Sequence, residues 1–251
     1  MIITKQPNNP ELHATAVQLS QDNLPQGWAL VSSSVNTRVA VQPNEGLYYK
    51  EFLPRSPLEY IKALLLGSRA TRARRNSDAL RKSGFDAPEH VAWGRLPNGH
   101  DYLIALAIPG DGITHWLRHG LTGRDPATLI LRRNLLQALG TFIGRLHNTG
   151  YIHGDLRPSN VLANYKGGQF RFALIDNERN ILRRPPPGKL LLKNLMQLNM
   201  LLPSDLTRSD RWRFFLAWQQ QYPELGHQEA RLLAIEAYQW AMRRLQAKGK
   251  L

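Results

Sequence analysis

The first half of the chain consists of short hydrophobic runs separated by turn residues. These runs are rich in β-branched and aromatic side chains, which favour strands. They predict five strands, at 28–34, 37–41, 47–52, 90–96 and 102–107. A basic segment from Ser68 to Ser83 lies between the third and fourth strands and stops before Gly84, as a helix does. The pattern therefore predicts a small antiparallel sheet with one helix.

The second half has the periodicity of helices. Leu135, Leu139, Phe142 and Leu146 recur on one helical face, which predicts a helix from about residue 126 to 147. Similar spacing predicts three later helices, near 189–202, 208–222 and 227–247. Two short strand-like runs precede these helices, at 161–163 and 170–175. This half is expected to be mainly α-helical.

The segment Ile108–Gly112 joins the two halves and is rich in Pro and Gly, which predicts a hinge. The expected architecture is therefore an α+β fold of two lobes. Residues 1–107 form a β-rich lobe with one helix, and residues 108–251 form a helical lobe. Ligands commonly bind at such a junction.

Charge narrows the choice of partner. The chain has 251 residues and a formal net charge of +14, from 33 Lys and Arg against 19 Asp and Glu. This balance predicts an anionic partner, which could be nucleic acid, an anionic membrane or a phosphorylated substrate. The absence of Cys excludes disulfides, thiolate catalysis and Cys-based zinc sites. Residues 1–7 lack the pattern of a signal peptide and no apolar run is long enough to span a membrane, so a soluble cytoplasmic protein is expected.

One motif carries chemistry. His153, Asp155 and Asn160 form the pattern His-x-Asp-x-x-x-x-Asn, and a later strand ends in Asp176. Phosphoryl transfer requires the reactants to be positioned and the phosphate charge to be neutralised. Asp155 would orient an attacking hydroxyl, Asn160 and Asp176 offer oxygen ligands for Mg²⁺, and Lys50 would meet the phosphates of ATP. The alternative, in which Asp155 caps a helix and Asn160 sits in a turn, explains each residue but not their order.

With these residues the chain resembles the protein-kinase-like superfamily. Within it, the chain is most similar to the bacterial lipopolysaccharide kinases, including InaA-like proteins, which phosphorylate Kdo or heptose in the inner core of lipopolysaccharide. The supporting segments are His153–Asn160, Leu174–Arg179, and the run from Ser68 to Pro88, which is similar to a Ser-Arg-Ala…Gly-Ile-Pro-x-Pro stretch of the family. The resemblance covers roughly residues 28–246.

The resemblance implies a kinase that uses ATP and Mg²⁺. It implies that Asp155 is catalytic and that Asn160 and Asp176 hold the metal. The implied nucleotide contacts are Lys50, Ser33, Ser34, Ala107 and Ile108. The implied substrate contacts are Arg157, Arg179, Arg183 and Arg184, whose guanidinium groups suit carboxylate and phosphate.

The family also implies where the protein acts. The acceptor would be the inner core of lipopolysaccharide with its lipid A, at the anionic surface of the inner membrane. The protein would be cytoplasmic and peripheral to that membrane. No nucleic-acid partner is expected, because the chain contains no recognised nucleic-acid module.

The sequence departs from the superfamily pattern in several places. Asp176-Asn177-Glu178 replaces Asp-Phe-Gly, and Asn194 stands where relatives often carry an Asp that supports the catalytic loop. No Glu lies between Glu59 and Glu89, and spacing puts Ala73 where the helical partner of the strand Lys is expected. Asp78 or Asp176 could pair with Lys50 instead. These departures keep open a catalytically weak pseudokinase, and the scaffold also suits a small-molecule kinase or an atypical protein kinase.

Other residues have a structural and a functional interpretation. Six basic side chains crowd the helix that follows Ser68, and they either form a solvated face or contact anionic lipid. They are Arg69, Arg72, Arg74, Arg75, Arg81 and Lys82. His153 is expected to brace the catalytic loop and His147 to close a helix. Four aromatic residues are expected in the core: Trp212, Phe214, Phe215 and Trp218.

Overall fold

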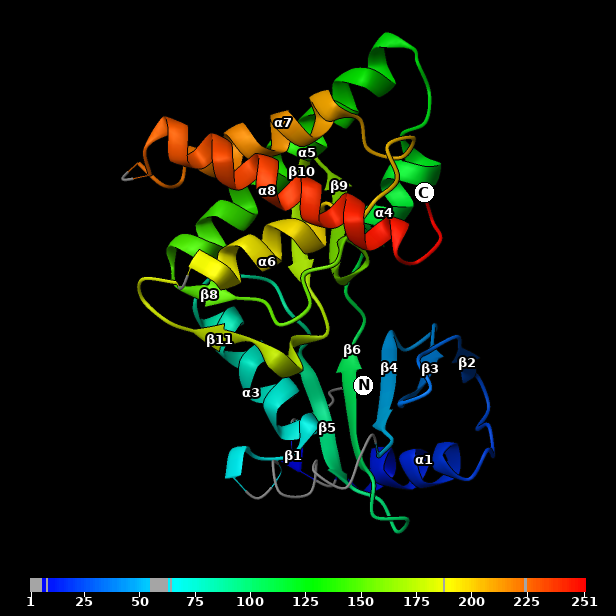
Figure 1. Ribbon diagram of the computed structural model, residues 1–251. Coiled ribbons are helices and arrows are strands. Elements are labelled where there is room, and N and C mark those ends of the chain that lie inside the picture. The colour runs from blue at the N-terminus through cyan, green and yellow to red at the C-terminus, as the bar shows by residue number, and fades with distance from the viewer. Residues whose placement is uncertain (1–5, 8, 55–62, 64, 187, 224) are drawn as a thin grey trace. The chain divides into compact units, whose positions relative to one another are not determined.

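The structure is a computed structural model that describes residues 6–7, 9–54, 63, 65–186, 188–223 and 225–251. Most of the N-terminal segment, for which no signal peptide is expected, and Glu59 lie outside the described residues. The chain divides into two compact units, Met1–Ile108 and Pro109–Leu251. Each unit has its own sheet and helices (Figure 1).

The first unit contains a six-stranded sheet. Its strands, in spatial order, are β1 (Gln6–Pro7), β5 (His90–Arg95), β6 (Asp101–Leu106), β4 (Leu47–Phe52), β3 (Thr37–Gln42) and β2 (Ala29–Val31). All neighbouring strands are antiparallel except β1, which runs parallel to β5. The five predicted strands are confirmed, while β1 was not expected.

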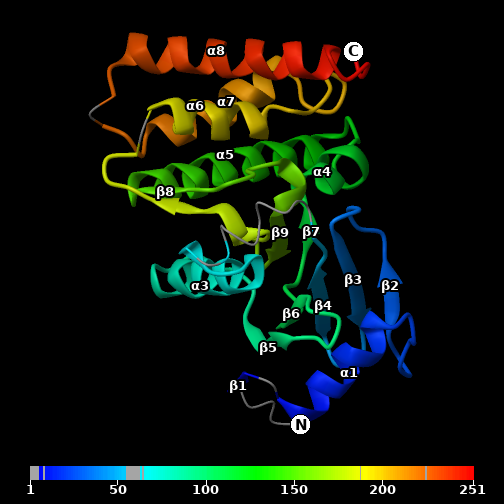
Figure 2. The ribbon, with the colours of Figure 1, turned by 60° about the horizontal axis from the view of Figure 1, so that its bottom comes forward.

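Among the described residues, two helices flank this sheet, one more than the sequence analysis expected. The additional helix is α1 (Pro10–Ser20), which begins where the Asn9 side chain accepts a hydrogen bond from the Leu12 N–H at 3.2 Å. Its buried side chains pack against Tyr49 and Ile104 of the sheet. The predicted helix is α3 (Arg69–Lys82), which begins after the cap Ser68. Figure 2 shows α1 and α3 flanking the strands.

Helix α3 packs on the sheet through small side chains. Ala70 and Ala73 are buried against Phe52 and Leu103, which lie on β4 and β6. Ala73 is the position at which spacing places the missing helical Glu. This position is occupied by an apolar contact between helix and sheet.

The sheet also buries a carboxylate. Glu51 of β4 is fully buried, and its oxygens accept hydrogen bonds from the Tyr49 hydroxyl at 3.2 Å, Arg38 Nη1 at 3.3 Å and Asn98 Nδ2 at 3.2 Å. Nδ1 of His100 lies 2.7 Å from the same carboxylate. Burial, followed by the nearby carboxylate, raises the pKa of Tyr49. A buried charge with this many partners fixes the relative positions of β3, β4 and the loop before β6.

The second unit is mainly helical, as predicted. Its principal helices are α5 (Pro126–Asn148), α6 (Gly188–Leu198), α7 (Arg208–Gln219) and α8 (His227–Gln246). Its strands are β7 (Asp111–Gly112), β8 (Tyr151–Ile152), β9 (Val161–Lys166), β10 (Gln169–Leu174) and β11 (Ile181–Leu182). Its short helical turns are α4 (Ile113–His115), a π-helix (Trp116–Gly120), and two 3₁₀ turns (Pro158–Asn160 and Asn177–Arg179). Strands β7, β9 and β10 form one antiparallel sheet, and β8 pairs with β11.

The segment predicted as a hinge contains the boundary between the two units and also a short strand. Asp111 and Gly112 are not a free connection, because they form β7 and pair with Ala163 and Leu162 of β9. Gly110, at φ 113°, makes the turn into this strand, and an added Cβ there would lie 2.7 Å from the carbonyl carbon of Ala163. A residue with a side chain therefore does not fit at this turn.

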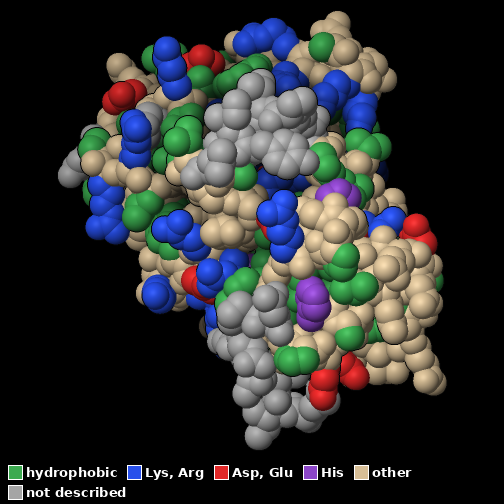
Figure 3. All heavy atoms as spheres, turned by 90° about the horizontal axis from the view of Figure 1, so that it is seen from below, with side chains coloured by type: hydrophobic (Ala, Val, Ile, Leu, Met, Phe, Trp, Pro, Cys, Tyr) green, Lys and Arg blue, Asp and Glu red, His purple; other side chains and the backbone are tan. Residues whose placement is uncertain are grey.

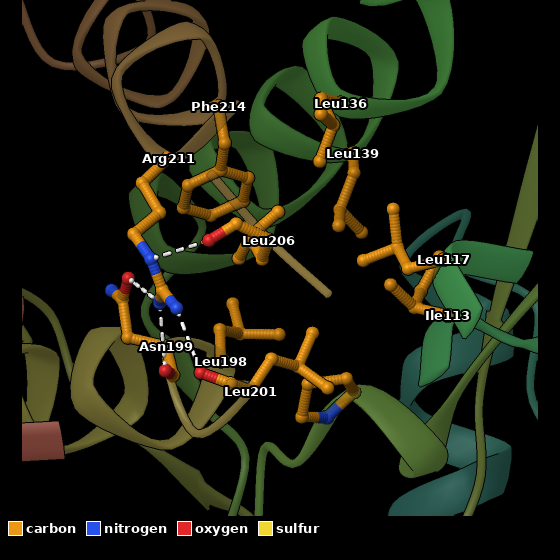
Figure 4. A pocket seen from close by; sticks show the side chains of 11 residues that line it. Ile113, Leu117, Leu136, Leu139, Leu198, Asn199, Leu201, Leu206, Arg211 and Phe214 are labelled. Atoms are coloured by element: carbon orange, nitrogen blue, oxygen red, sulfur yellow. Dashed lines mark hydrogen bonds between the residues drawn. The ribbon is translucent and has the colours of Figure 1, made fainter. Parts of the chain in front are cut away.

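The core of the second unit lies between α5 and α7. Phe214, Phe215 and Trp218 are buried, as expected, whereas Trp212 is 41% exposed. Figure 4 shows a small apolar cavity beside this core, with a volume of about 20 Å³. It is bordered by Arg211, which donates to the backbone oxygens of Asn199, Leu201 and Leu206 at 2.7, 2.7 and 3.2 Å. The cavity has room for about one water molecule, so it is a packing feature of the core.

Among the described residues, no helix combines the length and the apolar character needed to cross a membrane.

Candidate active site

The predicted catalytic loop connects β8 to β9 in the second unit and is closed by its own hydrogen bonds. The backbone oxygen of Asp155 accepts from the N–H of Arg157 and from Nδ2 of Asn160, each at 2.8 Å. The N–H of Asn160 donates to the Arg157 oxygen at 2.8 Å. The five-residue spacing between Asp155 and Asn160 therefore lets the Asn side chain tie the two ends of the turn together.

His153 braces this loop, as the sequence predicts. Its Nε2 donates to the Ile175 oxygen at 3.0 Å, and its Nδ1 accepts from the Asp155 N–H at 3.1 Å. Since Nδ1 accepts from a backbone N–H, the ring is neutral with its proton on Nε2. Burial lowers the pKa of His153 and favours that neutral form.

Asp176 is brought to the loop through its neighbour Ile175. The Ile175 N–H donates to the Asn160 oxygen at 3.0 Å, and the Ile175 oxygen accepts from His153. Both backbone polar groups of Ile175 are thus bonded to the loop. Asp176 then takes left-handed angles, φ 64° and ψ 46°, where the chain leaves β10. The structure therefore brings Asp155, Asn160 and Asp176 together within one unit.

Asn194 of α6 supports the loop from inside the protein. Its Oδ1 accepts from the His153 N–H at 3.0 Å and lies 3.1 Å from His147 Nε2, while its Nδ2 donates to the His153 oxygen at 2.7 Å. His147 accepts from Trp218 Nε1 at 3.1 Å through Nδ1. Burial lowers the pKa of His147 to about 4. His147 does more than close α5, because its ring links the core to the loop.

Gln197, one helical turn after Asn194, contacts the Asp155 carboxylate itself. Its Nε2 donates to Asp155 Oδ1 at 3.1 Å. Its Oε1 accepts from the Leu156 N–H at 3.1 Å and from Asn194 Nδ2 at 3.3 Å. Sequence reasoning missed this residue. The available signal was its three-residue spacing from Asn194, which places both side chains on one helical face.

Arg157 makes the other contact to Asp155. Its Nε donates to Oδ1 and Oδ2 of Asp155 at 2.9 and 2.8 Å, and its Nη2 also donates to Oδ2. The bond to Asp155, followed by the nearby charges of Asp155 and Asp176, raises the pKa of Arg157. The Arg157 side chain remains 59% exposed. Arg157 therefore lies at the predicted site, where it binds the Asp155 carboxylate.

The segment after Asp176 is held against the same loop. Asn177 Nδ2 donates to the Leu174 oxygen at 2.8 Å, and Asn180 bridges the Asn177 side chain to the Gly154 N–H at 2.9 and 3.2 Å. A Cβ at Gly154 would lie 2.6 Å from the Arg179 oxygen. The altered Asp-Asn-Glu segment is therefore anchored by its Asn, where the superfamily pattern has Phe.

The three later arginines lie along this segment. Arg179 and Arg183 are exposed, and Arg179 Nε lies 3.4 Å from the carboxylate of Glu178. The Arg184 Nε donates to the Thr149 oxygen at 2.7 Å. Strand β11 lies between Arg179 and Arg183 in the sequence, and its pairing with β8 holds this segment beside the predicted catalytic loop.

The residues at the loop fit a magnesium ion. Because Nδ2 of Asn160 donates to the backbone oxygen of Asp155, Oδ1 of Asn160 is the side-chain atom that can bind a metal. Asp176 supplies a carboxylate one residue after Ile175, whose N–H donates to the Asn160 oxygen. Mg²⁺ binds proteins through one or two carboxylates and keeps several waters. The candidate set is thus one carboxylate and one amide oxygen; no group of three or more His, Asp or Glu suited to a metal occurs within the described ranges.

The predicted nucleotide contacts lie in the first unit. Lys50 is on β4, paired in register with Val39 and Leu103, and its Nζ lies 5.3 Å from the centre of the Phe52 ring. The hydroxyls of the two serines bond within their turn, Ser33 Oγ to the Thr37 oxygen at 2.7 Å and Ser34 Oγ to Thr37 Oγ1 at 2.9 Å.

The other predicted nucleotide contacts, Ala107 and Ile108, come directly after β6. The Ala107 N–H donates to the Gly46 oxygen at 2.7 Å, and Ile108 follows as the last residue of the unit.

His90 is a buried titratable residue at the start of β5 in the same unit. Burial lowers the pKa of His90 to about 4, and the positive charges of Arg74, Arg81 and Lys50 lower it further.

The six basic residues at helix α3 are neither all part of a solvated face nor all available to contact anionic lipid. Arg69 is buried, donates to the backbone oxygens of Asn36 and Leu53 at 3.1 and 3.2 Å, and stacks on Phe52 at 4.9 Å. Three others are also engaged: Arg72 with the Gly67 oxygen, Arg74 with Asp78 and the Trp93 ring, and Arg81 with Glu89. Arg75 and Lys82 are exposed. Figure 3 shows Lys and Arg side chains scattered over one face of the molecule, with Asp and Glu sparser.

Comparisons with known proteins agree with the motif. Residues 47–218 match the lipopolysaccharide kinase (Kdo/WaaP) family model. A search of curated proteins gave no match. Among solved structures, WaaP in complex with acyl carrier protein has a TM-score of 0.59 and 19% identity, covering 85% of this chain and 87% of that chain.

Two further structures share the fold. The aminoglycoside phosphotransferase APH(3'')-Id from Streptomyces rimosus has a TM-score of 0.51 and 13% identity, covering 92% of this chain and 98% of that chain. Monomeric WbdD has a TM-score of 0.50 and 22% identity, covering 86% of this chain and 49% of that chain. At these identities the likeness shows a protein-kinase-like fold.

The family match spans β4, the loop from Asp155 to Asn160, and Asp176. This chain therefore belongs to the Kdo/WaaP family of lipopolysaccharide kinases, phosphotransferases that act on a sugar hydroxyl.

Proposed function

We propose that this chain transfers the γ-phosphoryl group of Mg·ATP to a hydroxyl of Kdo or heptose in the inner core of lipopolysaccharide. The observation that supports this most is that backbone hydrogen bonds of Ile175, to Asn160 and His153, join Asp176 to the loop that carries Asp155 and Asn160. One hydroxyl-orienting carboxylate and two oxygen ligands for a metal are what phosphoryl transfer requires of a protein.

Each residue has a role in this proposal. Asp155 accepts a hydrogen bond from the acceptor hydroxyl and orients it. Asn160 and Asp176 hold Mg²⁺, which neutralises phosphate charge when it is bound. Lys50 meets the nucleotide phosphates, and the turn at Ser33 and Ser34 and the strand end at Ala107 and Ile108 border the nucleotide. The arginines that contact the acceptor are Arg157, Arg179, Arg183 and Arg184.

The proposed place of action is the cytoplasmic surface of the inner membrane. The net charge of +14 favours an anionic surface and an acceptor that carries lipid A phosphates. Each basic residue near such a surface contributes about 1 kcal/mol. Exposed Arg75 and Lys82 are available for this contact.

A transfer assay with several acceptor classes tests the proposal. The purified protein is incubated with Mg·ATP and lipid A bearing Kdo, lipid A bearing heptose, a soluble aminoglycoside, or a protein. We expect phosphate on a core sugar. Transfer to soluble acceptors and never to the core glycolipid would contradict the proposal and favour a small-molecule or atypical protein kinase. If millimolar Mg·ATP failed to raise the melting temperature, the pseudokinase alternative would be favoured.

A further inference from the structure

Asp155 is held by two donors that differ in their freedom to move. Gln197 is 8% exposed, and its side-chain amide is fixed by bonds to Asn194 and Leu156 as well as to Asp155. The Arg157 side chain is 59% exposed and lies on the outer side of the same carboxylate. One donor is therefore a fixed part of the interior, and the other can leave without disturbing it.

Together these donors engage both oxygens of the carboxylate. Asp155 Oδ1 accepts from Gln197 Nε2, the single Nε–H of Arg157 is shared between Oδ1 and Oδ2, and Oδ2 also accepts from Arg157 Nη2. Three N–H groups thus occupy a carboxylate that has about four acceptor sites, and Arg157 supplies two of them from the exposed side. A substrate hydroxyl therefore gains full access to Asp155 only when Arg157 moves.

The chemistry of guanidinium indicates what would move it. An arginine fork binds a carboxylate or a phosphate through two parallel hydrogen bonds, so it can exchange one such anion for another. A sugar that carries an anionic group beside its reactive hydroxyl offers Arg157 a second anion in the same approach. A neutral sugar does not.

We propose that Arg157 is a latch on Asp155 that opens when the acceptor presents a carboxylate or phosphate, and that Gln197 keeps Asp155 in position when the latch is open. This inference rests on the proposed function. It makes Arg157 the residue that discriminates anionic from neutral acceptors, and Gln197 a positioning residue for the reaction on either kind.

The step that follows opening is an ordinary transfer. The acceptor oxygen forms a bond to the γ-phosphorus, the bond from that phosphorus to the β,γ-bridging oxygen breaks, and ADP leaves with the electron pair. The hydroxyl proton passes to the Asp155 carboxylate. No further reactant is needed.

Binding can be followed at Arg157 without turnover. In the ¹⁵N-labelled full chain, the Nε–H signal of Arg157 is assigned by its loss in Arg157→Lys. Kdo and its carboxylate-reduced alcohol form one pair of probes, and heptose phosphate and heptose form the other. We expect the signal to shift with the anionic member of at least one pair and with neither neutral member. No shift with either anion, or an equal shift with Mg·ATP alone, would overturn the latch.

Kinetics separate the two donors. Arg157→Ala is expected to lower the ratio of kcat/KM between the anionic and neutral acceptors by about 10- to 100-fold, the scale of one charge-assisted hydrogen bond. Gln197→Ala is expected to lower kcat for both acceptors equally and leave that ratio unchanged. Arg124→Ala, at an exposed position of the same unit, is the matched control.

The outcomes distinguish this inference from the proposed function. If Arg157→Ala keeps the wild-type ratio, the latch is wrong although the sugar kinase stands. If the wild type phosphorylates no core sugar, the proposed function is wrong, and the Arg157 signal still decides whether an acceptor anion opens the latch.

Discussion

The side-chain amide of Asn194 bonds to both backbone polar groups of His153, accepting from its N–H at 3.0 Å and donating to its oxygen at 2.7 Å. A carboxylate at this position could accept from the His153 N–H but could not donate to the His153 oxygen. The amide therefore suits this chain, in which His147 already donates to the same Oδ1.

Asn194→Asp should lower the free energy of unfolding by about 1–3 kcal/mol, because it leaves the buried His153 oxygen without its donor. Urea denaturation at neutral pH measures the change. Asn148→Asp, at an exposed position of the same unit, serves as a comparison. An unchanged unfolding midpoint for Asn194→Asp would show that the amide donor does not support the loop.

Stability should fall in mild acid because of two buried histidines. The pKa of His147 and that of His90 are both lowered to about 4 by burial, against about 6.5 in the unfolded chain. The native state therefore binds fewer protons than the unfolded state between these values. The stabilisation is complete above about pH 6.5 and is lost as the pH falls towards 4, with a slope of up to about 1.4 kcal/mol per pH unit for each histidine.

Unfolding measured from pH 7.5 to 4 checks this dependence. His147→Gln should be less stable at pH 7 but show a shallower slope. A slope in the variant equal to that of the wild type would mean that His147 is not the titrating group.

Glu51→Ala should destabilise the first unit strongly. Removing the carboxylate takes away a hydrogen-bond acceptor from Arg38, the Tyr49 hydroxyl and Asn98. Removing one partner of a buried ion pair costs about 3–5 kcal/mol. Thermal unfolding measures the loss, with exposed Glu45→Ala as the control. Equal melting temperatures for the two variants would contradict the structural role of Glu51.

Asn160→Ala should raise the Mg²⁺ concentration needed for half-maximal activity by about tenfold or more, since it removes one of two proposed protein ligands. It should also loosen the loop, because Asn160 Nδ2 bonds to the Asp155 oxygen. Asn160→Asp separates the two effects: it restores an oxygen ligand but not the donor. If both variants kept the wild-type Mg²⁺ dependence, Asn160 would not be a ligand.

The sequence predicted the parts of the site that are local in the chain. The spacing of Asp155 and Asn160 is a property of one turn, and Asp176 follows a recognisable strand. Helix α1 was missed although Asn9 and Pro10 are good helix-starting residues and its buried positions, Leu12, Ala16 and Leu19, recur at helical spacing.

Other features could not be read from the chain because they depend on tertiary packing. Gln197 reaches Asp155 across 42 positions of sequence, and only the packing of α6 under the loop brings them together. The same holds for the arginines of α3. Their charge suggested an exposed patch, whereas Arg69 is buried because backbone oxygens and the Phe52 ring accept it.

The most direct test of the account is the mass of a Kdo- or heptose-bearing lipid A incubated with Mg·ATP and the purified protein. The wild type and the exposed control Asp86→Asn should add one phosphate, about 80 Da, while Asp155→Asn should slow the addition by about 10²- to 10⁴-fold. Phosphate added by Asp155→Asn at the wild-type rate would contradict the role of this carboxylate and, with it, the proposed site.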